Sequence, residues 1–113
     1  MLTLGSQLKY YYYLNRVDMR KGYNGLSGLV QEHYEKNPEE EKVYVFLNRR
    51  GDKIKILHRT PRGFTLYYKR LEKGVFKLPK YDIEEAIIIL NYTEMVMMID
   101  GISIISLKKE IRY

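Results

Sequence analysis

Apolar and polar residues alternate along three short segments in the middle of the chain. These segments, residues 42–48, 53–59 and 63–71, are rich in β-branched and aromatic side chains and are separated by the turn sequences RRGD and TPRG. A period of two places successive side chains on opposite faces of a strand, and such turns join neighbouring antiparallel strands. The pattern therefore predicts a three-stranded antiparallel β-meander.

The same alternation predicts which side chains share a face of this sheet. One face is expected to be core, with Val43, Val45, Leu47, Ile54, Ile56, Phe64, Leu66 and Tyr68. The other face mixes cations with aromatic rings: Tyr44, Phe46, Lys53, Lys55, Leu57, Arg59, Thr65, Tyr67 and Lys69. Because antiparallel sheets commonly leave one face in water, we expect this second face to be exposed.

A stripe of apolar residues at three- and four-residue steps predicts one long helix before the meander. Its members are Met19, Tyr23, Leu26, Val30 and Tyr34. Asp18 is a natural N-cap, and the Asn-Pro pair at residues 37–38 is expected to end the helix. Gly22, Gly25 and Gly28 leave a strip without side chains on this helix, which we interpret as tight internal packing. A partner protein or a nucleic-acid backbone is the alternative occupant of that strip.

Further elements are predicted toward both ends of the chain. Residues 8–15 indicate a strand with tyrosines on both faces, and residues 86–90 indicate another. Asp82 with Glu85 would suit a helix cap, but the isoleucine run that follows favours the strand. Thr93 is expected to cap a short helix that Gly101 ends, and residues 102–113 to add an edge strand. Together these elements predict an α+β fold, with an antiparallel meander sheet, one long helix on a face and a short C-terminal helix.

Length and composition narrow the class of protein. The 113 residues suit a single domain spanning residues 1–113, and the absence of cysteine excludes disulfides and thiolate zinc sites. The first residues lack the pattern of a secretory signal, so we expect a cytoplasmic protein. The apolar segment at residues 86–107 contains Asn91, Glu94 and Asp100, which favours core over a membrane span.

The charge is unevenly distributed along the chain. The net charge is +6, but residues 48–80 hold eleven Lys or Arg and two acids, whereas the remainder holds nine bases and twelve acids. Such a cationic block indicates a polyanionic partner such as nucleic acid, with a solvated basic face as the alternative.

Two cationic pairs are candidate binding residues. Arg49 and Arg50 lie at a predicted hairpin tip, where arginine can grip phosphate or a guanine edge, although a solvated turn is the alternative. Arg20 and Lys21 lie in the first predicted helical turn, where free N–H groups would help to hold a phosphate or a carboxylate. An internal ion pair, for example with Asp18, is the other interpretation of this second pair.

The sequence contains no recognisable catalytic constellation. His33 and His58 lie far apart, and no P-loop, dinucleotide fingerprint or paired-histidine metal motif is present. A nuclease would need a carboxylate cluster, and none can be named. We therefore expect no enzyme activity, no metal or cofactor, and no small-molecule substrate.

Three long motifs resemble a known family. VDMRKGYNGLSGLV, VYVFLNRRGDKIKIL and GFTLYYKRLEKGVFKLP, within residues 17–79, resemble the small accessory protein of bacterial insertion sequences of family sixty-six. That protein is the product of the second open reading frame and is often called TnpB. The resemblance implies a role in transposition beside a separately encoded transposase. Members commonly carry tryptophans that this chain lacks, with Phe64, Tyr67 and Leu78 in their places.

The charge pattern and the resemblance together give a leading hypothesis, a noncatalytic accessory protein that binds DNA, such as the ends of the element. The residues expected to contact DNA are Arg49, Arg50, Lys53, Lys55, Arg59, Lys69 and Arg70, with Arg20 and Lys21 as a second site. The alternative is an adaptor that binds the transposase without contacting DNA.

Overall fold

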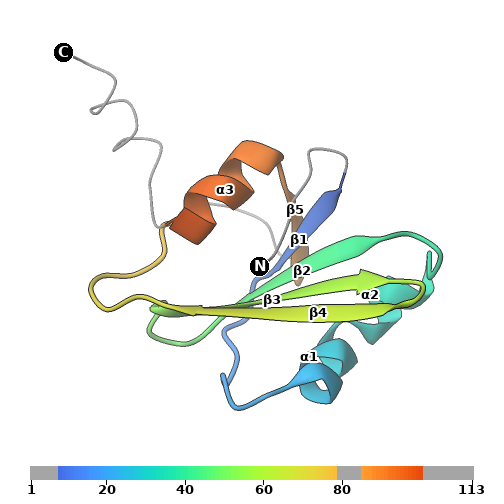
Figure 1. Cartoon of the computed structure of the whole chain (residues 1–113), viewed down its shortest axis with the longest axis horizontal. Coiled ribbons are helices and arrows are strands. Elements are labelled where there is room, and N and C mark those ends of the chain that lie inside the picture. Colours follow the sequence, from blue (N-terminus) through green and yellow to red (C-terminus); the bar gives the residue numbers. More distant parts are fainter. Residues whose placement is uncertain (1–7, 79–84, 101–113) are drawn as a thin grey trace.

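A five-stranded β-sheet with helices on both of its faces forms the body of the protein (Figure 1). The computed structural model describes residues 8–78 and 85–100. The strands are β1 (Lys9–Tyr13), β2 (Lys42–Leu47), β3 (Lys53–Thr60), β4 (Gly63–Arg70) and β5 (Ile87–Leu90). The helices are α1 (Tyr23–Leu29), α2 (Gln31–Glu35) and α3 (Tyr92–Asp100).

The sheet has the strand order β4-β3-β2-β1-β5 and is mixed. β2, β3 and β4 pair antiparallel in sequence order, whereas β1 pairs parallel with β2 and antiparallel with β5. The predicted α+β class is confirmed, but the expectation of a wholly antiparallel sheet is wrong. The reason is that the α1–α2 segment carries the chain back to the starting end of β1, as a parallel crossover requires.

The predicted long helix is two short ones, α1 and α2, which meet at Val30 with φ −116° and ψ 11°. Asp18 does not cap a helix, because α1 begins after Gly22 without a side-chain cap. The Asp18 carboxylate instead accepts the backbone N–H of Arg20 at 2.8 Å, a local turn that competes with helix formation. The glycines in this segment further weaken a continuous helix, each by about 1 kcal/mol relative to alanine.

The predicted packing of the glycine strip is also wrong. A Cβ atom at Gly22 or Gly28 would meet nothing within 4 Å, and one at Gly25 would meet the side chain of Lys21 at 3.1 Å. Among the described residues no strand or other helix presses on the strip, and α1 packs on the sheet through Leu26.

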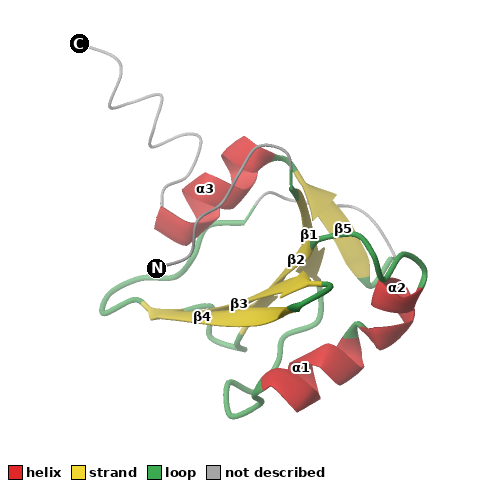
Figure 2. Ribbon diagram, turned by 45° about the vertical axis from the view of Figure 1, so that its right-hand side comes forward, coloured by secondary structure: helices red, strands yellow, loops and turns green. Residues whose placement is uncertain are grey.

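Helices lie on both faces of the sheet (Figure 2), and each face has its own apolar core. α3 covers one face, where Met95 and Met98 pack against the side chains of β1, β2, β3 and β5. α1 and α2 cover the other face, where Leu26 and Tyr34 pack against Tyr44 and its neighbours. All six residues of β2 are buried as a result. The expectation of an exposed second face is therefore wrong, because its aromatic and aliphatic members form a core of their own.

The predicted assignment of β4 to the two faces is wrong by one residue. Gly63 pairs with Thr60, which places Leu66 opposite Leu57 and Tyr68 opposite Lys55. Phe64, Leu66 and Tyr68 therefore belong to the α1 face, and Tyr67 and Lys69 to the α3 face. A shift of one position in the pairing register moves every side chain of a strand to the other face. The geometry of the turn sets this register, and the alternation of residues does not reveal it.

The elements at the two ends follow the sequence pattern more closely. The strands expected at residues 8–15 and 86–90 are confirmed as β1 and β5. Asn91, not Thr93, caps α3: its side chain accepts the Glu94 N–H at 2.8 Å, and the Glu94 carboxylate accepts the Asn91 N–H at 3.1 Å. Asp82, Gly101 and the tail strand expected at residues 102–113 lie outside the described residues.

No helix in the described ranges is long and apolar enough to cross a membrane.

Candidate functional site

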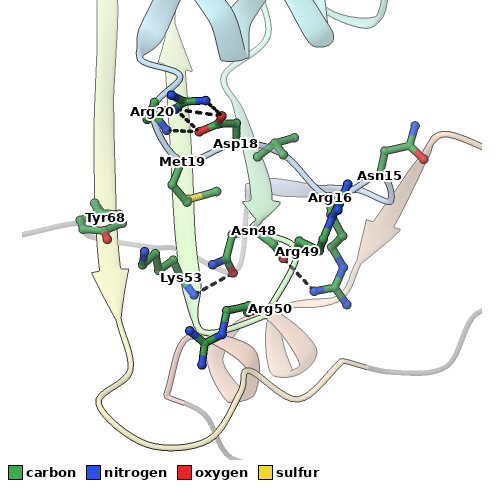
Figure 3. A pocket seen from close by; sticks show the side chains of 11 residues that line it. Asn15, Arg16, Asp18, Met19, Arg20, Asn48, Arg49, Arg50, Lys53 and Tyr68 are labelled. Atoms are coloured by element: carbon green, nitrogen blue, oxygen red, sulfur yellow. Dashed lines mark hydrogen bonds and ion pairs between the residues drawn. The ribbon is translucent and has the colours of Figure 1, made fainter.

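An open groove of about 870 Å³ lies between the β1–α1 loop and the β2–β3 turn (Figure 3). Its cationic lining residues are Arg16, Arg20, Arg49, Arg50 and Lys53. The remaining lining residues are Asn15, Val17, Asp18, Met19, Asn48 and Tyr68. Five cations against one carboxylate give the lining a net charge of +4. We call this feature the basic groove.

The turn that carries two of the arginines is held rigidly by Asn48. The Asn48 side chain donates to the Asp52 carboxylate at 2.7 Å and accepts the Lys53 N–H at 3.1 Å. The hydrogen bond from Asn48 is the main reason that the pKa of Asp52 is lowered. Gly51, with φ +78°, completes the turn in a conformation that side chains disfavour. Arg49 and Arg50 thus project from a preorganised backbone into solvent.

Neighbouring segments anchor this turn to the rest of the fold. The Phe76 N–H donates to the Gly51 carbonyl at 2.8 Å, and the Leu71 N–H donates to that of Asp52 at 2.8 Å. Arg16 donates to the Asn48 carbonyl at 3.0 Å, so its guanidinium lies against the turn. Arg16 is a lining residue that the sequence pattern does not reveal, because the parallel pairing of β1 with β2 brings it here.

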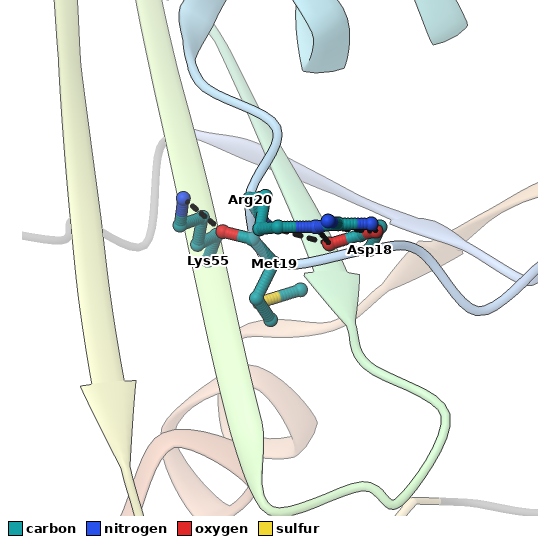
Figure 4. A network of polar contacts seen from close by, with 4 residues as sticks. All are labelled: Asp18, Met19, Arg20 and Lys55. Atoms are coloured by element: carbon teal, nitrogen blue, oxygen red, sulfur yellow. Dashed lines mark hydrogen bonds and ion pairs between the residues drawn. The ribbon is translucent and has the colours of Figure 1, made fainter.

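Arg20 and Asp18 form the ion pair that was the alternative interpretation of the Arg20–Lys21 pair (Figure 4). The Arg20 Nη2 to Asp18 Oδ2 distance is 2.6 Å, and the Arg20 side chain is 91% exposed. Hydrogen bonds from Arg20 are the main reason that the pKa of Asp18 is lowered to about 2. Arg20 lines the groove with its charge compensated, whereas Lys21 is exposed beside the groove and is not one of its lining residues.

Lys55, which was predicted to contact DNA, makes hydrogen bonds within the protein instead. Its ammonium donates to the carbonyl of Met19 at 2.7 Å (Figure 4) and to that of Lys21 at 2.8 Å. It also lies 5.7 Å from the centre of the Tyr68 ring. Lys55 therefore fastens the β1–α1 loop to the sheet, and this loop carries Arg16 and Arg20.

Two further predicted DNA contacts also lie away from the groove. Lys69 is on the α3 face and donates to the Ile99 carbonyl at 2.7 Å, near the C-terminal end of α3. The Arg59 guanidinium stacks on the Tyr34 ring at 3.5 Å, with its Nη1 atom buried. Arg70 is exposed and pairs with Lys53 in the strand register, which places it next to the groove.

The structure thus brings together four of the nine predicted site residues: Arg20, Arg49, Arg50 and Lys53. Such an arrangement suits an anion with several oxygen atoms, because each guanidinium offers a planar fork of donors and stays charged at any physiological pH. Within residues 8–78 and 85–100, no group of three or more His, Cys, Asp or Glu side chains is placed to hold a metal ion. Phosphate groups are the natural match for the groove.

Fold and groove define a class: a small mixed-sheet domain that presents arginines from a preorganised turn and from the loop beside it. The chain belongs to the IS66 Orf2-like family, whose family model matches residues 8–109. Membership implies an accessory role in transposition of an insertion sequence of this family, as the sequence resemblance indicated.

Two curated relatives share this similarity across most of their length. Both are from Sinorhizobium fredii (strain NBRC 101917 / NGR234). "Uncharacterized protein y4hO" is 29% identical over 102 residues, which cover 90% of this chain and 87% of the relative. "Uncharacterized protein y4jC" is 27% identical over 94 residues, which cover 83% and 79%. No solved structure matches the chain.

Proposed function

We propose that this protein is a noncatalytic accessory protein that binds DNA through the basic groove during transposition. The observation that carries this proposal is the convergence of Arg16, Arg49, Arg50 and Lys53 on one groove with a net lining charge of +4. Family membership supports the process, transposition of an insertion sequence. The resemblance implies that a separately encoded transposase performs the cutting and joining of strands. The ends of the element are the expected DNA.

Phosphate contacts would supply most of the affinity. Each phosphate that a lysine or arginine neutralises releases a condensed counterion, so binding weakens as salt is added. With about four phosphates in the groove, the logarithm of the affinity should fall against the logarithm of salt with a slope of about −3.6 on duplex DNA. The anchored turn favours binding, because little backbone order has to be imposed on association.

A titration of the purified protein tests this proposal. Element-end duplex, random duplex and purified transposase are each titrated at several salt concentrations, with fluorescence anisotropy as the readout. We expect DNA binding with the stated salt dependence. Binding of the transposase together with no DNA binding at any salt concentration would contradict the proposal.

A second candidate function, an adaptor for the transposase, is favoured by the surface at β5. β5 is an outer strand of the described sheet, and its Ile89 side chain is 63% exposed. An outer strand with an exposed apolar side chain can pair with a strand of a partner. Replacement of Ile89 by lysine should then abolish co-purification with the transposase and leave DNA binding unchanged.

A further inference from the structure

Tyr68 adds an aromatic ring to the wall of the basic groove. It lies on β4 and its side chain is half-exposed, although the alternation along this strand predicts it in the core. In the described part of the chain Tyr68 is stacked on no other ring. Phe64, equally exposed at 49% on the same face of the same strand, is stacked on Tyr23 at 3.8 Å. Among the described rings Phe64 therefore already has a stacking partner, whereas Tyr68 has none and has the Lys55 ammonium 5.7 Å from its ring centre.

The register places this ring among the groove's cations. Tyr68 pairs with Lys55 and Arg70 pairs with Lys53, so the ring lies two positions along the sheet from a cationic pair in which Arg70 is exposed and Lys53 is partly buried. That separation is about 7 Å along a strand. The Lys55 ammonium, fixed by two backbone carbonyls, lies 5.7 Å from the ring centre and helps to hold the ring in place.

A flat ring beside phosphate-binding cations suits an unpaired nucleotide better than a base pair. In a duplex the faces of each base are covered by its neighbours, whereas a single strand can turn a base onto an aromatic side chain. We infer that the basic groove holds single-stranded DNA, with Tyr68 stacked on an unpaired base and Arg49, Arg50 and Lys53 on the flanking phosphates. This inference rests on the proposed function and specifies its substrate.

The first test compares binding of a single-stranded oligodeoxynucleotide, its duplex and the matching oligoribonucleotide by fluorescence anisotropy at one salt concentration. We expect the single strand to bind more tightly than the duplex. Tyr68→Leu should weaken single-strand binding about fivefold or more, the lower range of base–aromatic stacking. Tyr68→Phe, which keeps the ring, and Phe64→Leu, which removes an equally exposed ring outside the groove, should each stay within about twofold of the wild type.

A second readout does not depend on comparing affinities. The chain contains no tryptophan, so Tyr68→Trp introduces a single reporter in the groove. We expect its fluorescence to be quenched by the single strand, with saturation at the dissociation constant seen by anisotropy. Phe64→Trp, at the matched position, should show no quenching.

Each contrary outcome has a distinct meaning. No binding of any nucleic acid would overturn the proposed function. Duplex binding as tight as single-strand binding, with Tyr68→Leu without effect and Tyr68→Trp unquenched, would overturn this inference alone. Tighter binding of the ribonucleotide would overturn the assignment of DNA as the ligand.

Discussion

The ammonium of Lys55 donates to the Met19 carbonyl at 2.7 Å, across 36 positions of the sequence. A second donation, to the Lys21 carbonyl at 2.8 Å, fixes the same loop at a second point. Lys55, which the sequence alone predicts to contact DNA, thus stabilises the fold through internal hydrogen bonds. The cations that are exposed to solvent lie next to it. These internal bonds hold the β1–α1 loop, one wall of the groove, against the sheet.

Lys55→Met should destabilise the protein and weaken DNA binding together. The substitution leaves two backbone carbonyls without a charged donor, and hydrogen bonds to charged groups contribute about 1.5–3 kcal/mol. We expect the free energy of unfolding, measured by urea denaturation, to fall by about that amount. Lys36→Met, which removes an exposed cation outside the groove, serves as the control. An unchanged free energy of unfolding in Lys55→Met would contradict the anchoring role.

Gly51→Ala should cost about 1–2 kcal/mol of stability, because the backbone at Gly51 has φ +78°. The new Cβ would also lie 3.2 Å from Nη1 of Arg16 and push that guanidinium from the turn. Gly63→Ala is a matched control, since a Cβ there meets nothing within 4 Å and its φ is not positive. Thermal unfolding of both variants checks the prediction. Equal effects at the two positions would contradict it.

The elements of the fold were largely predictable from local pattern, whereas their faces were not. β1, β3 and β5 follow from β-branched and aromatic runs, because burial on a pleated surface selects those residues. The face of the sheet on which Tyr68 lies depends on the turn at Gly63. The burial of Tyr44 under α1 and α2 depends on the crossover from β1 to β2, which the local alternation of residues does not predict. Alternation reports which residues share a side of one strand and leaves open which side of the sheet that is.

The candidate site was predictable in part for the same reason. Arg49 and Arg50 follow from a turn sequence, since a charged turn between two strands projects into solvent. Arg16 and Tyr68 line the groove beside these arginines because of the strand pairing. Lys69 does not, because it lies on the other face of the sheet. Charge pattern therefore located the turn but did not distinguish displayed cations from anchoring ones.

Asp18→Asn should strengthen DNA binding. Asp18 is fully charged at pH 7, since its pKa is about 2, and it compensates Arg20 at 2.6 Å. The substitution raises the net charge of the groove lining by one, so the salt slope on duplex should become steeper by about 0.9. Glu32→Gln, a charge-matched change on an exposed residue of α2, should have no such effect. Weaker binding by Asp18→Asn would show that the ion pair positions Arg20 for the ligand.

Acidification should destabilise the protein through His33. Burial lowers the pKa of His33 below its usual 6.5, as do Lys42 and Lys36, while Glu40 opposes the shift. The unfolded chain therefore takes up the proton more readily than the folded protein. The contribution of neutral His33 to the free energy of unfolding is fully present above pH 6.5. It is lost as the pH falls toward the lower pKa that His33 has in the folded state.

Urea denaturation at pH 7.5 and at about pH 5 measures this effect, because the two conditions bracket the usual pKa of histidine. His33→Gln keeps a polar atom for the Tyr44 hydroxyl, which lies 2.8 Å from Nδ1 in the native protein. We expect the variant to lose less stability between the two conditions than the wild type. An identical loss would assign the acid sensitivity to other groups.

The salt dependence of DNA binding by the Arg49→Ala/Arg50→Ala double variant tests the central claim most directly. The groove account predicts weaker binding and a slope on duplex shallower by about 1.8 than that of the wild type, as expected when two phosphate contacts are lost. Lys36→Ala/Arg62→Ala removes two exposed cations outside the groove lining and should leave the slope unchanged. The same slope in the wild type and the arginine variant would contradict the account.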